Sequence, residues 1–491
     1  MRISEQAASF LFVENALSPM HAAAITTLSE DLALTDLQDH IASRLHLCPK
    51  YRQKLAYVPF NLAQPLWADD DAFDIAQHIS ESTTQGTSTA ELLSHAAALS
   101  LELLPRNQPL WRMHLIHHAG KAAVLQTVHH ALLEGVSIGD DAQVFFDLKA
   151  DAKAVDVPEW NPRPAPSANE MMLDAIRDNT KSFSSRAQDL QSSDADRTEM
   201  LRRATESVLR FVNEPVQAAP WNRGVVGAKR DFCYREFAYG DVRKIKRALG
   251  GIENDVVLTV VSEAAARYIN EHQDSVEGAH LRIMCPVRIR REDDDGVRGS
   301  RISGTFPVLN AQPQNIIDRH QQVRWENDAI RNSREAHALQ LLVELAPPLP
   351  AIPSTDWFAP SAFGSMFTNM GLNPATFNPL RLLGQLMPQN LGRTLTSGLS
   401  QVAGFNFNCV SVPGAQTTQY LANRQVDQQF ILPALAGNLG FAVAITTYAQ
   451  TITFNLVCDP ELLPDLERMA QLFEEVFLEL LSTAQTEAAQ I

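Results

Sequence analysis

One long interruption divides this chain and limits how it can fold. From Asp151 to about Pro220 the sequence is first proline-rich (WNPRPAPSANE) and then serine-rich and polar (SFSSRAQDLQSSDADRTE), with no sustained apolar period. This composition is typical of an exposed connection, because it supplies few apolar side chains for a core. We therefore predict a linker with helical parts at 151–220 between a unit at 1–150 and a unit at 221–491, and the 491 residues are enough for two or three full cores.

Both units mix the periodicities of helices and strands. In the first unit, WRMHLIHH and AAVLQTVHH are separated by Ala119-Gly120-Lys121, which predicts a β-hairpin. In the second unit, LRIMCPVRI predicts a buried strand, and GFAVAITTY with TITFNLVC predicts another hairpin. NDVVLTVVSEAAARYINEH predicts a helix capped at Asn254 or Asp255, and apolar residues at helical spacing behind Pro464 predict a C-terminal helix. The expected fold class is α/β (α+β) in both units.

Charge and cysteine content argue against several classes of protein. The formal net charge is −16, which disfavours nucleic-acid binding because phosphates require a basic face. The five cysteines are scattered and lack CxxC or metal-ligand spacing, so neither a disulfide framework nor a zinc site is expected. The N-terminal segment lacks the pattern of a signal peptide, and no stretch reaches about 18 uninterrupted apolar residues. We expect a cytoplasmic protein that does not cross a membrane.

The end of the first hairpin carries the residues with the most chemical potential. The string TVHHALLEGV places His129 beside His130, followed by Glu134 and Gly135. Neighbouring strand residues point to opposite faces, so only one histidine can serve a given site. Gly135 indicates a tight turn or a close approach of another group, and Glu134 can pair with a cation that holds the loop. The alternative is that both histidines are ordinary core or surface residues and that Glu134 is a solvated acid.

Two further histidine features are given no function. His117-His118 form a second pair, but no acid and glycine follow them at the same spacing. A histidine and a glutamate four residues apart, such as His130 and Glu134, can share a helix face and bind a metal ion. Neither an HExxH motif nor a third ligand at useful spacing accompanies them, so no metal site is predicted.

The string TVHHALLEGVS resembles the HHxxxDG motif of the CoA-dependent acyltransferase superfamily. The sequence around it is similar to one branch, the bacterial wax ester synthase/diacylglycerol acyltransferase family. The other matching segments, in chain order, are FLFVEN with Ser18-Pro19-Met20-His21, LWADDDAFDIAQHI, Pro109-Leu110-Trp111, Asn254-Asp255, PVRIR at 286–290 and DPELLPDLERM. Each string is short, but their order and spacing identify the chain as a member of this family along nearly its whole length.

Three positions depart from the family pattern. The acid of the motif is Glu134 where Asp is usual, Ser300 stands where Asn is usual, and VSVPGA at 410–415 replaces Ser-Asn-Val-Pro-Gly-Pro. The extra methylene of Glu134 shifts its carboxylate by roughly one C–C bond, and a misplacement of that size costs about a hundredfold in rate if nothing compensates. The departures therefore bear on activity and substrate range rather than on the fold.

The resemblance implies a catalytic role for His130. As a general base with a pKa near neutral pH, it takes the proton of a hydroxyl that attacks the thioester carbonyl of acyl-CoA and returns it to the departing thiolate. His129, on the opposite face, is expected to hold the turn. By analogy with the family acid, Glu134 is expected to form an ion pair with an arginine of the second unit, Arg290 on the motif match or Arg288 as the alternative.

Four more residues are candidates for substrate binding, and each also has a plainer role. Trp111 is either a substrate contact or a core anchor. Asn254 and Asp255 either take part in the chemistry or only cap a helix. Ser411 either donates a hydrogen bond to the oxyanion or forms a turn before Pro413-Gly414.

The resemblance also implies the architecture and the substrates. The fold implied is two chloramphenicol-acetyltransferase-like domains with mixed sheets and flanking helices, with His130 in a channel between them. The function implied is O-acyl transfer from acyl-CoA to a long-chain alcohol, to diacylglycerol or to both, without a further cofactor. Alternatives are acylation of another hydroxyl and a non-catalytic lipid-binding relative.

A second long stretch, from about 346 to 404, is apolar, rich in proline and glycine and nearly free of charge. It is either an ordinary buried connection or a cover that faces a lipid tunnel or the surface of a membrane or lipid droplet. The second interpretation predicts a cytoplasmic protein that attaches peripherally to the inner membrane or to lipid inclusions.

Overall fold

The structure is a computed structural model of the chain. It describes residues 2–4, 7–8, 10–11, 14–59, 63–133, 143–152, 157–178, 199, 202, 216–223, 226–273, 277–289, 301–333, 336 and 405–490. The elements of the first half are β1 (His21–Leu28), α2 (Leu34–Ala42), β2 (Gln53–Ala56), β3 (Leu66–Asp69), β4 (Ile79–Thr83), α3 (Thr89–Ser100), β5 (Trp111–His118), β6 (Lys121–His129) and α4 (His130–Leu133).

The second half also alternates strands and helices, which confirms the predicted mixture of α and β in both halves. Its strands are β7 (Asp231–Ala238), β8 (His280–Ile289), β9 (Arg301–Thr305), β10 (Val308–Asn310), β11 (Phe407–Pro413), β12 (Tyr420–Leu421), β13 (Arg424–Leu432), β14 (Phe441–Tyr448) and β15 (Thr451–Cys458). Its helices are α8 (Tyr239–Leu249), α9 (Glu253–His272), α10 (Ile316–Ser333) and α15 (Leu466–Gln490).

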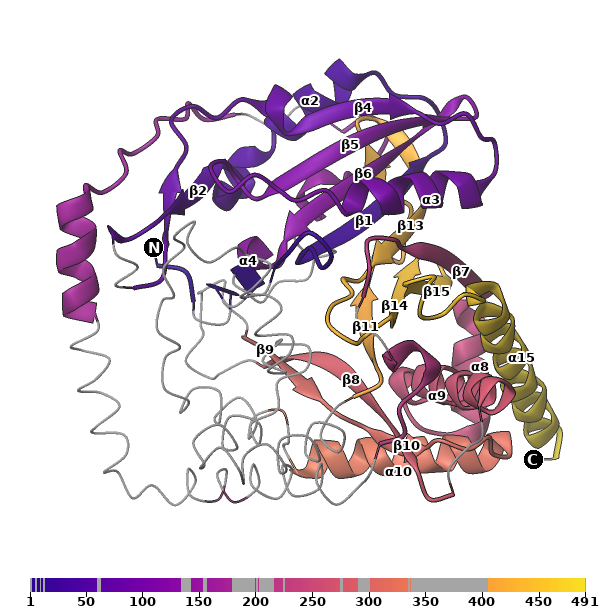
Figure 1. Cartoon of the computed structure of the whole chain (residues 1–491). Helices are drawn as coiled ribbons and strands as arrows, with labels where there is room; N and C mark the ends of the chain where they lie inside the picture. The colour runs from indigo at the N-terminus through magenta and orange to yellow at the C-terminus, as the bar shows by residue number, and fades with distance from the viewer. Residues whose placement is uncertain are drawn as a thin grey trace.

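The first sheet has the strand order β12-β13-β1-β6-β5-β4 (Figure 1). The predicted hairpin of β5 and β6 is confirmed, since these strands pair antiparallel from Trp111 with Val128 to His118 with Lys121. Ala119 and Gly120 form its turn with φ values of 50° and 76°, the positive values that a two-residue hairpin turn requires. This turn leaves Lys121 inside β6 rather than in the connection.

Strands β12 and β13 belong to the first sheet although they come from the second half of the chain. β1 pairs antiparallel with β6 on one side, with His21 opposite His129, and with β13 on the other, with Ala23 opposite Leu432. β1, whose first residue lies opposite His129, is thus paired with strands from both halves of the chain. The prediction of units at 1–150 and 221–491 does not anticipate that strands of the second half join the sheet of the first half. Pairing between strands so far apart in the chain leaves no local pattern in the sequence.

The second sheet has the order β10-β8-β11-β14-β15-β7, with β9 paired to β8. The predicted hairpin of β14 and β15 is confirmed, while β11 runs parallel to both β8 and β14. Helices α8, α9 and α15 pack against one another beside this sheet (Figure 1). The predicted cap of α9 at Asn254 or Asp255 is wrong, because the helix begins at Glu253 after Ile252. Asp255 instead accepts the Ile252 N–H at 2.7 Å from the first turn.

The two sheets share a core. Apolar side chains of β1, β6 and β13 pack in one cluster with side chains of β14 and β15, and the cluster includes Ile25, Leu125, Phe430, Ala442 and Val457. All five are buried, so the two halves bury apolar surface against each other and stabilise a common arrangement.

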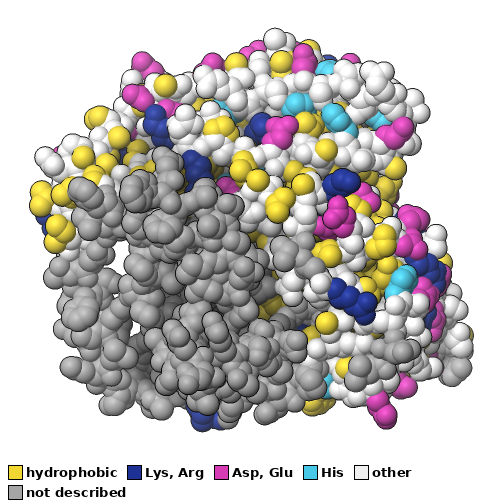
Figure 2. Space-filling model, in the orientation of Figure 1, with side chains coloured by type: hydrophobic (Ala, Val, Ile, Leu, Met, Phe, Trp, Pro, Cys, Tyr) yellow, Lys and Arg dark blue, Asp and Glu magenta, His cyan; other side chains and the backbone are white. Residues whose placement is uncertain are grey.

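Part of the predicted linker is described, and it lies on the first half. Residues 157–170 are exposed except for the half-buried Trp160, whose ring lies 5.1 Å from the Arg52 guanidinium carbon. Residues 168–178 then form a helix that buries Met171 and Ala175 against Val58. Figure 2 shows apolar side chains gathered at the left edge of the molecule, where this helix lies in Figure 1.

Candidate active site

The histidine pair stands where a strand changes into a helix. β6 ends at His129, and the short helix α4 begins at His130. On the neighbouring strand, the residue opposite His129 is His21, which begins β1 directly after Met20. The pair is therefore placed at one end of the first sheet, beside the segment that enters β1.

Two backbone contacts with Met20 fix His130. The Met20 carbonyl accepts the His130 backbone N–H at 2.9 Å and the His130 Nδ1–H at 3.0 Å. A carbonyl oxygen can only accept, so Nδ1 must carry a proton, and the neutral ring then has its lone pair on Nε2. Within the described residues no hydrogen bond engages Nε2, and the ring stacks on Phe10 with 5.0 Å between centroids. Among the described residues, His130 thus leaves at Nε2 the unengaged lone pair that a general base needs.

Burial keeps His130 neutral. Removal from water lowers its pKa to about 4, and the hydrogen bond to the Met20 carbonyl only partly opposes this shift. The pKa therefore lies below the near-neutral value expected from the sequence, because desolvation disfavours the charged form of the ring. At pH 7 the side chain is ready to accept a proton without first losing one.

His129 has the opposite tautomer. Its Nδ1 accepts the Ala131 backbone N–H at 3.0 Å, so the proton of the neutral ring lies on Nε2. That Nε2 lies 3.3 Å from Glu14 Oε1, close in distance but outside the alignment of a full hydrogen bond. Burial lowers the His129 pKa, while Glu14 opposes this shift. These contacts agree with a holding role for His129, which stays a prediction.

Glu14 is a buried acid that the sequence interpretation did not assign to the site. Its Oε1 accepts the Met20 backbone N–H at 3.0 Å and lies 3.2 Å from His21 Nε2, and its Oε2 accepts from Arg106 at 3.0 Å. Burial alone would raise the pKa of Glu14, but His129 and His21 outweigh it and hold the pKa well below its usual range. The available signal was an acid inside the apolar run FLFVENALSPM, a position where an unpaired charge is costly.

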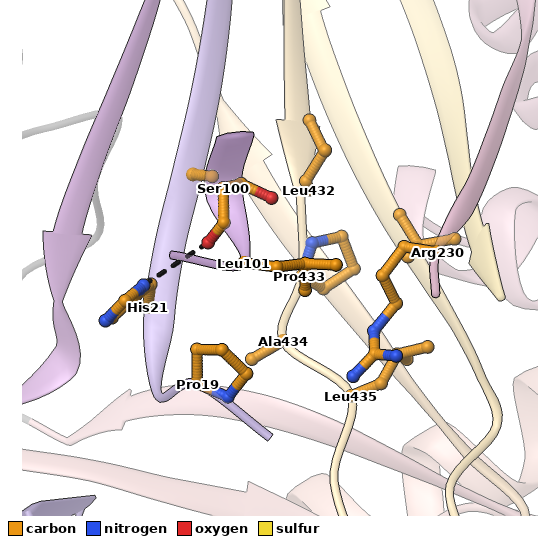
Figure 3. Close-up of a pocket in the computed structure, with 11 residues that line it drawn as sticks. Pro19, His21, Ser100, Leu101, Arg230, Leu432, Pro433, Ala434 and Leu435 are labelled. Atoms are coloured by element: carbon orange, nitrogen blue, oxygen red, sulfur yellow. Dashed lines mark hydrogen bonds between the residues drawn. The ribbon is translucent and has the colours of Figure 1, made fainter. Parts of the chain in front are cut away.

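The second half of the chain contacts the same segment. Arg230 donates to the Leu17 carbonyl at 2.7 Å, and burial lowers its pKa to about 10. A small pocket lies between Arg230 on one side and Pro19 with His21 on the other, closed by the Leu432–Leu435 segment (Figure 3). His21 Nδ1 donates to the Ser100 carbonyl at 3.3 Å beside this pocket. Residues 14–21 are therefore held from both halves.

Two of three predicted substrate residues, Trp111 and Asp255, have internal contacts. Trp111 is fully buried, donates from Nε1 to the Tyr51 carbonyl at 2.8 Å and stacks on His78. Asp255 is also buried and accepts from Asn327 Nδ2 at 2.7 Å, while Asn254 is half-buried in the first turn of α9. These contacts support the core and helix-end roles, and substrate contact by these residues stays a prediction.

The remaining predicted residues have no described contact with the histidine pair. Ser411 is exposed on β11, where it pairs with Ile445, and its oxyanion role stays a prediction. Glu134, Gly135 and Arg290 lie outside the described residues, as do Ser300 and the whole apolar stretch at 346–404. Of Arg288, the structure describes the backbone in β8 but not the side chain.

Metal and disulfide chemistry have no described residues to support them. No group of histidine, cysteine or acidic side chains in the described part of the chain could hold a metal ion, and none of the five cysteines, each described, forms a disulfide. None of the described helices combines the length and apolar character required to span a bilayer.

Known protein families match most of this chain. The chain matches the family model of the wax ester synthase/diacylglycerol acyltransferase catalytic domain at residues 3–257 and that of the family's C-terminal domain at residues 299–481. The chain therefore belongs to the wax ester synthase/diacylglycerol acyltransferase family. A putative diacylglycerol O-acyltransferase of Mycobacterium tuberculosis is 26% identical over 501 residues, which cover 98% of this chain and 90% of the relative. Another from the same species is 23% identical and covers 91% of this chain and 88% of the relative.

Solved structures show the same fold. The wax ester synthase/diacylglycerol acyltransferase of Marinobacter aquaeolei is 20% identical with a TM-score of 0.62, and the match covers 99% of this chain and 100% of that one. The starter condensation domain of rhizomide synthetase, a mutant in complex with C8-CoA and Leu-SNAC, is 11% identical with a TM-score of 0.57 and coverages of 99% and 94%. The predicted two-domain, chloramphenicol-acetyltransferase-like fold is thereby confirmed.

Proposed function

We propose that this chain transfers a fatty acyl group from acyl-CoA to the hydroxyl of a long-chain alcohol, of diacylglycerol or of both, with His130 as the general base. The observation that carries the proposal is the fixed tautomer of His130, whose Nδ1–H donates to the Met20 carbonyl and leaves the Nε2 lone pair available. Family membership supports the reaction class, and the C8-CoA complex of a protein with the same fold supports acyl-CoA as the donor.

The proposed reaction needs no covalent enzyme intermediate. The alcohol oxygen attacks the thioester carbonyl while His130 Nε2 takes the hydroxyl proton, so the C–O bond forms as the proton leaves. The C–S bond then breaks, and His130 returns the proton to the CoA thiolate. Such proton transfer typically contributes about 10² to 10⁴ in rate. Burial lowers the pKa of His130, which keeps Nε2 unprotonated throughout the neutral range.

A direct assay tests this proposal. Purified protein is incubated with labelled palmitoyl-CoA and either hexadecanol or diacylglycerol, and both the ester and the free CoA are followed. We expect ester and CoA to appear in equal amounts with at least one alcohol. Release of CoA without ester would instead indicate a thioesterase, and no turnover with any alcohol would support the non-catalytic alternative.

The non-catalytic alternative can also be tested at position 134, where Glu replaces the usual Asp. If Glu134 works as the motif acid, Glu134→Asp shortens its reach and Glu134→Gln removes its charge, so both variants lose activity and the Gln variant loses more. In a decayed relative, the wild type is nearly inactive and Glu134→Asp restores turnover. Glu134→Asp should therefore lower activity if the chain is an active enzyme and raise it if the chain is a decayed relative. Thermal melts exclude unfolding as the cause of a lost activity.

We further propose that the protein meets its lipid substrates at a lipid surface. The net charge of −16 opposes attachment to anionic lipids, so the attachment must be apolar, and the 346–404 stretch supplies candidate apolar residues such as Trp357 and Phe367. Sedimentation with neutral liposomes tests this apolar attachment. A variant with polar residues in place of the apolar ones from Trp357 to Phe367 should no longer sediment with the liposomes. Binding that disappears at high salt would contradict it, since it would reveal an electrostatic attachment.

A further inference from the structure

Glu14 lies next to the backbone that holds the proposed base. Its Oε1 accepts the N–H of Met20, and the carbonyl of Met20 accepts both the backbone N–H and the Nδ1–H of His130. Met20 is therefore held at both of its backbone groups, on one side by the acid and on the other by the histidine. Movement of Met20 would release the contact that fixes the tautomer of His130.

The Glu14 carboxylate also lies close to His129 and His21. His129 Nε2 and His21 Nε2 lie 3.3 and 3.2 Å from Glu14 Oε1, while Arg106 donates to Oε2. The groups that face Glu14 from the elements around it are thus Met20 N–H, two imidazoles and one guanidinium. Met20, Arg106 and the Nε2–H of His129 direct donors at Glu14, which suits an ionised carboxylate at a buried position, while His21 uses its Nδ1–H on the Ser100 carbonyl.

We propose that Glu14 is a positioning residue for acyl transfer, because it fixes Met20 and through Met20 the orientation and tautomer of His130. This inference rests on the proposed function of His130 as the base. It predicts that loss of the carboxylate lowers kcat more than it changes KM, since Glu14 acts through Met20 on the orientation of the proton acceptor.

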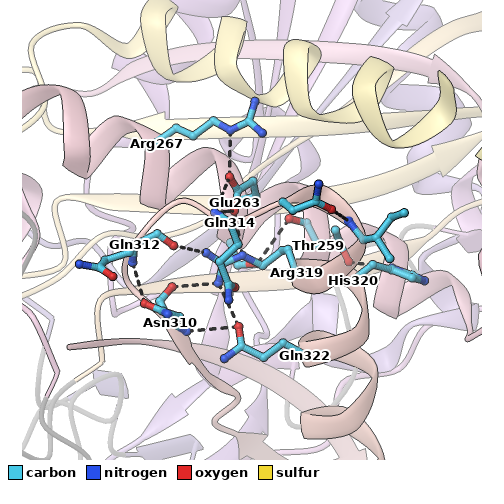
Figure 4. Close-up of polar contacts among 12 residues, drawn as sticks. Thr259, Glu263, Arg267, Asn310, Gln312, Gln314, Arg319, His320 and Gln322 are labelled. Atoms are coloured by element: carbon cyan, nitrogen blue, oxygen red, sulfur yellow. Dashed lines mark hydrogen bonds and ion pairs between the residues drawn. The ribbon is translucent and has the colours of Figure 1, made fainter. Parts of the chain in front are cut away.

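A matched control is available in Glu263. Its carboxylate is fully buried on α9, accepts from Arg319 and Arg267 at 2.9 Å each, and also accepts the Gln314 backbone N–H (Figure 4). Glu263 therefore resembles Glu14 in burial, in its arginine partners and in holding a backbone N–H. Its described contacts include no residue of the 14–21 segment or of the histidine pair, so any purely structural effect of removing a buried acid should be shared by both.

The experiment compares Glu14→Gln, Glu14→Ala and Glu263→Gln in the full chain. Glu14→Gln keeps an oxygen that can accept from Met20 but loses the charge, and we expect kcat to fall about tenfold. Glu14→Ala removes the acceptor, and we expect a fall of about a hundredfold, with KM for palmitoyl-CoA within about twofold in both variants. Glu263→Gln should lower the melting temperature but leave kcat within about twofold of the wild type. The proposal is overturned if folded Glu14→Gln keeps more than half of the wild-type kcat, or if Glu263→Gln loses as much.

Imidazole spectra test the positioning independently of activity. In protein labelled with ¹⁵N-histidine, long-range ¹H–¹⁵N spectra report which ring nitrogen carries the proton, and His130→Ala assigns the signal. We expect His130 as the Nδ1–H tautomer in the wild type and in Glu263→Gln, and a mixture of tautomers in Glu14→Gln. An unchanged His130 signal in Glu14→Gln overturns the positioning role even if the wild type transfers no acyl group, whereas a wild type without turnover but with the expected spectra contradicts only the proposed function.

Discussion

The hairpin of β5 and β6 carries two histidine pairs with different surroundings. His117, at the end of β5, is partly exposed and lies between the carboxylates of Asp31 and Glu81, at 2.7 and 3.2 Å. His130, directly after β6, donates to a backbone carbonyl and stacks on a phenylalanine ring. Carboxylate neighbours raise the pKa of His117, with the Asp31 hydrogen bond as the main cause, while burial lowers the pKa of His130 to about 4.

This comparison shows that the dipeptide itself does not determine the chemistry. Both rings of the His117 pair have polar side chains as partners, since His118 Nδ1 lies 2.7 Å from the Thr84 hydroxyl. The Asp31 and Glu81 carboxylates favour the charged form of His117, which cannot accept a proton, whereas burial favours the neutral form of His130, whose Nε2 has no partner among the described residues. The surroundings of each pair therefore decide which histidine can serve as a base.

The largest expected difference between the pairs is in turnover. His130→Ala removes the proposed base and should lower kcat by about a hundredfold or more, whereas His117→Ala should leave it within about twofold. Steady-state rates of both variants, with melting curves to confirm folding, measure this. A His130 variant that keeps more than about a tenth of the wild-type turnover would falsify the assignment of the base.

The two pairs should also differ in their response to pH. The proposed base works only when neutral, and its pKa is lowered to about 4, so activity should be constant from about pH 5.5 to 8 and fall as the pH drops through about 4. Initial rates in short assays, limited to the pH range in which the fold persists, measure this. An acid limb near the usual histidine value of about 6.5 would show that His130 is exposed to water in the working enzyme.

A smaller effect is expected from His129→Ala. The substitution leaves the Ala131 N–H without its acceptor and removes a ring that contacts Glu14, at a cost of about 1–3 kcal/mol for a buried polar group without a partner. The melting temperature should fall by a few degrees, and kcat should fall by less than about tenfold. Loss of turnover equal to that of His130→Ala, at an unchanged melting temperature, would mean that His129 takes part in the chemistry.

The smallest effect concerns the stability contribution of His117. Its pKa in the folded state is raised, so its contacts with Asp31 and Glu81 stabilise the fold fully below the unfolded pKa, and this contribution is lost as the pH rises through the folded pKa. His117→Ala should therefore lower the melting temperature more at pH 6 than at pH 9. The effect at pH 6 should be only about 1 °C, because exposed ion pairs are screened. A difference that grows with pH would contradict the assigned sign.

Local patterns were sufficient to predict much of this fold. Both hairpins, the strand that became β8 and the C-terminal helix follow from apolar periodicity and from turn residues such as Ala119-Gly120. The start of α9 was misplaced because Asp255 can act either as a cap or from the first turn, and the sequence does not distinguish these positions. The place of β13 in the first sheet depends on pairing between distant segments, which no local pattern records.

The candidate site was predicted only in part. The motif picked out His129 and His130, but Glu14, His21 and Arg106 meet them only through the pairing of β1 with β6 and the path of the 14–21 segment. The lowered pKa of His130 likewise arises from burial, which depends on the whole arrangement. Local sequence patterns cannot predict the contacts of Glu14 or the lowered pKa of His130, because both depend on contacts between segments far apart in the sequence.

The pairing of β1 with β13 also constrains how the protein is made. Thr27 and Gln428, which are hydrogen-bonded across this pair, are 401 positions apart. At a synthesis rate of about 5–20 residues per second, β1 leaves the ribosome roughly 20 to 80 seconds before its partner exists. During that time one edge of β1 stays unpaired, which invites pairing with another nascent chain. The N-terminal half should therefore need chaperone protection during synthesis, and a chain that stops before residue 424 should aggregate rather than fold around its histidine pair.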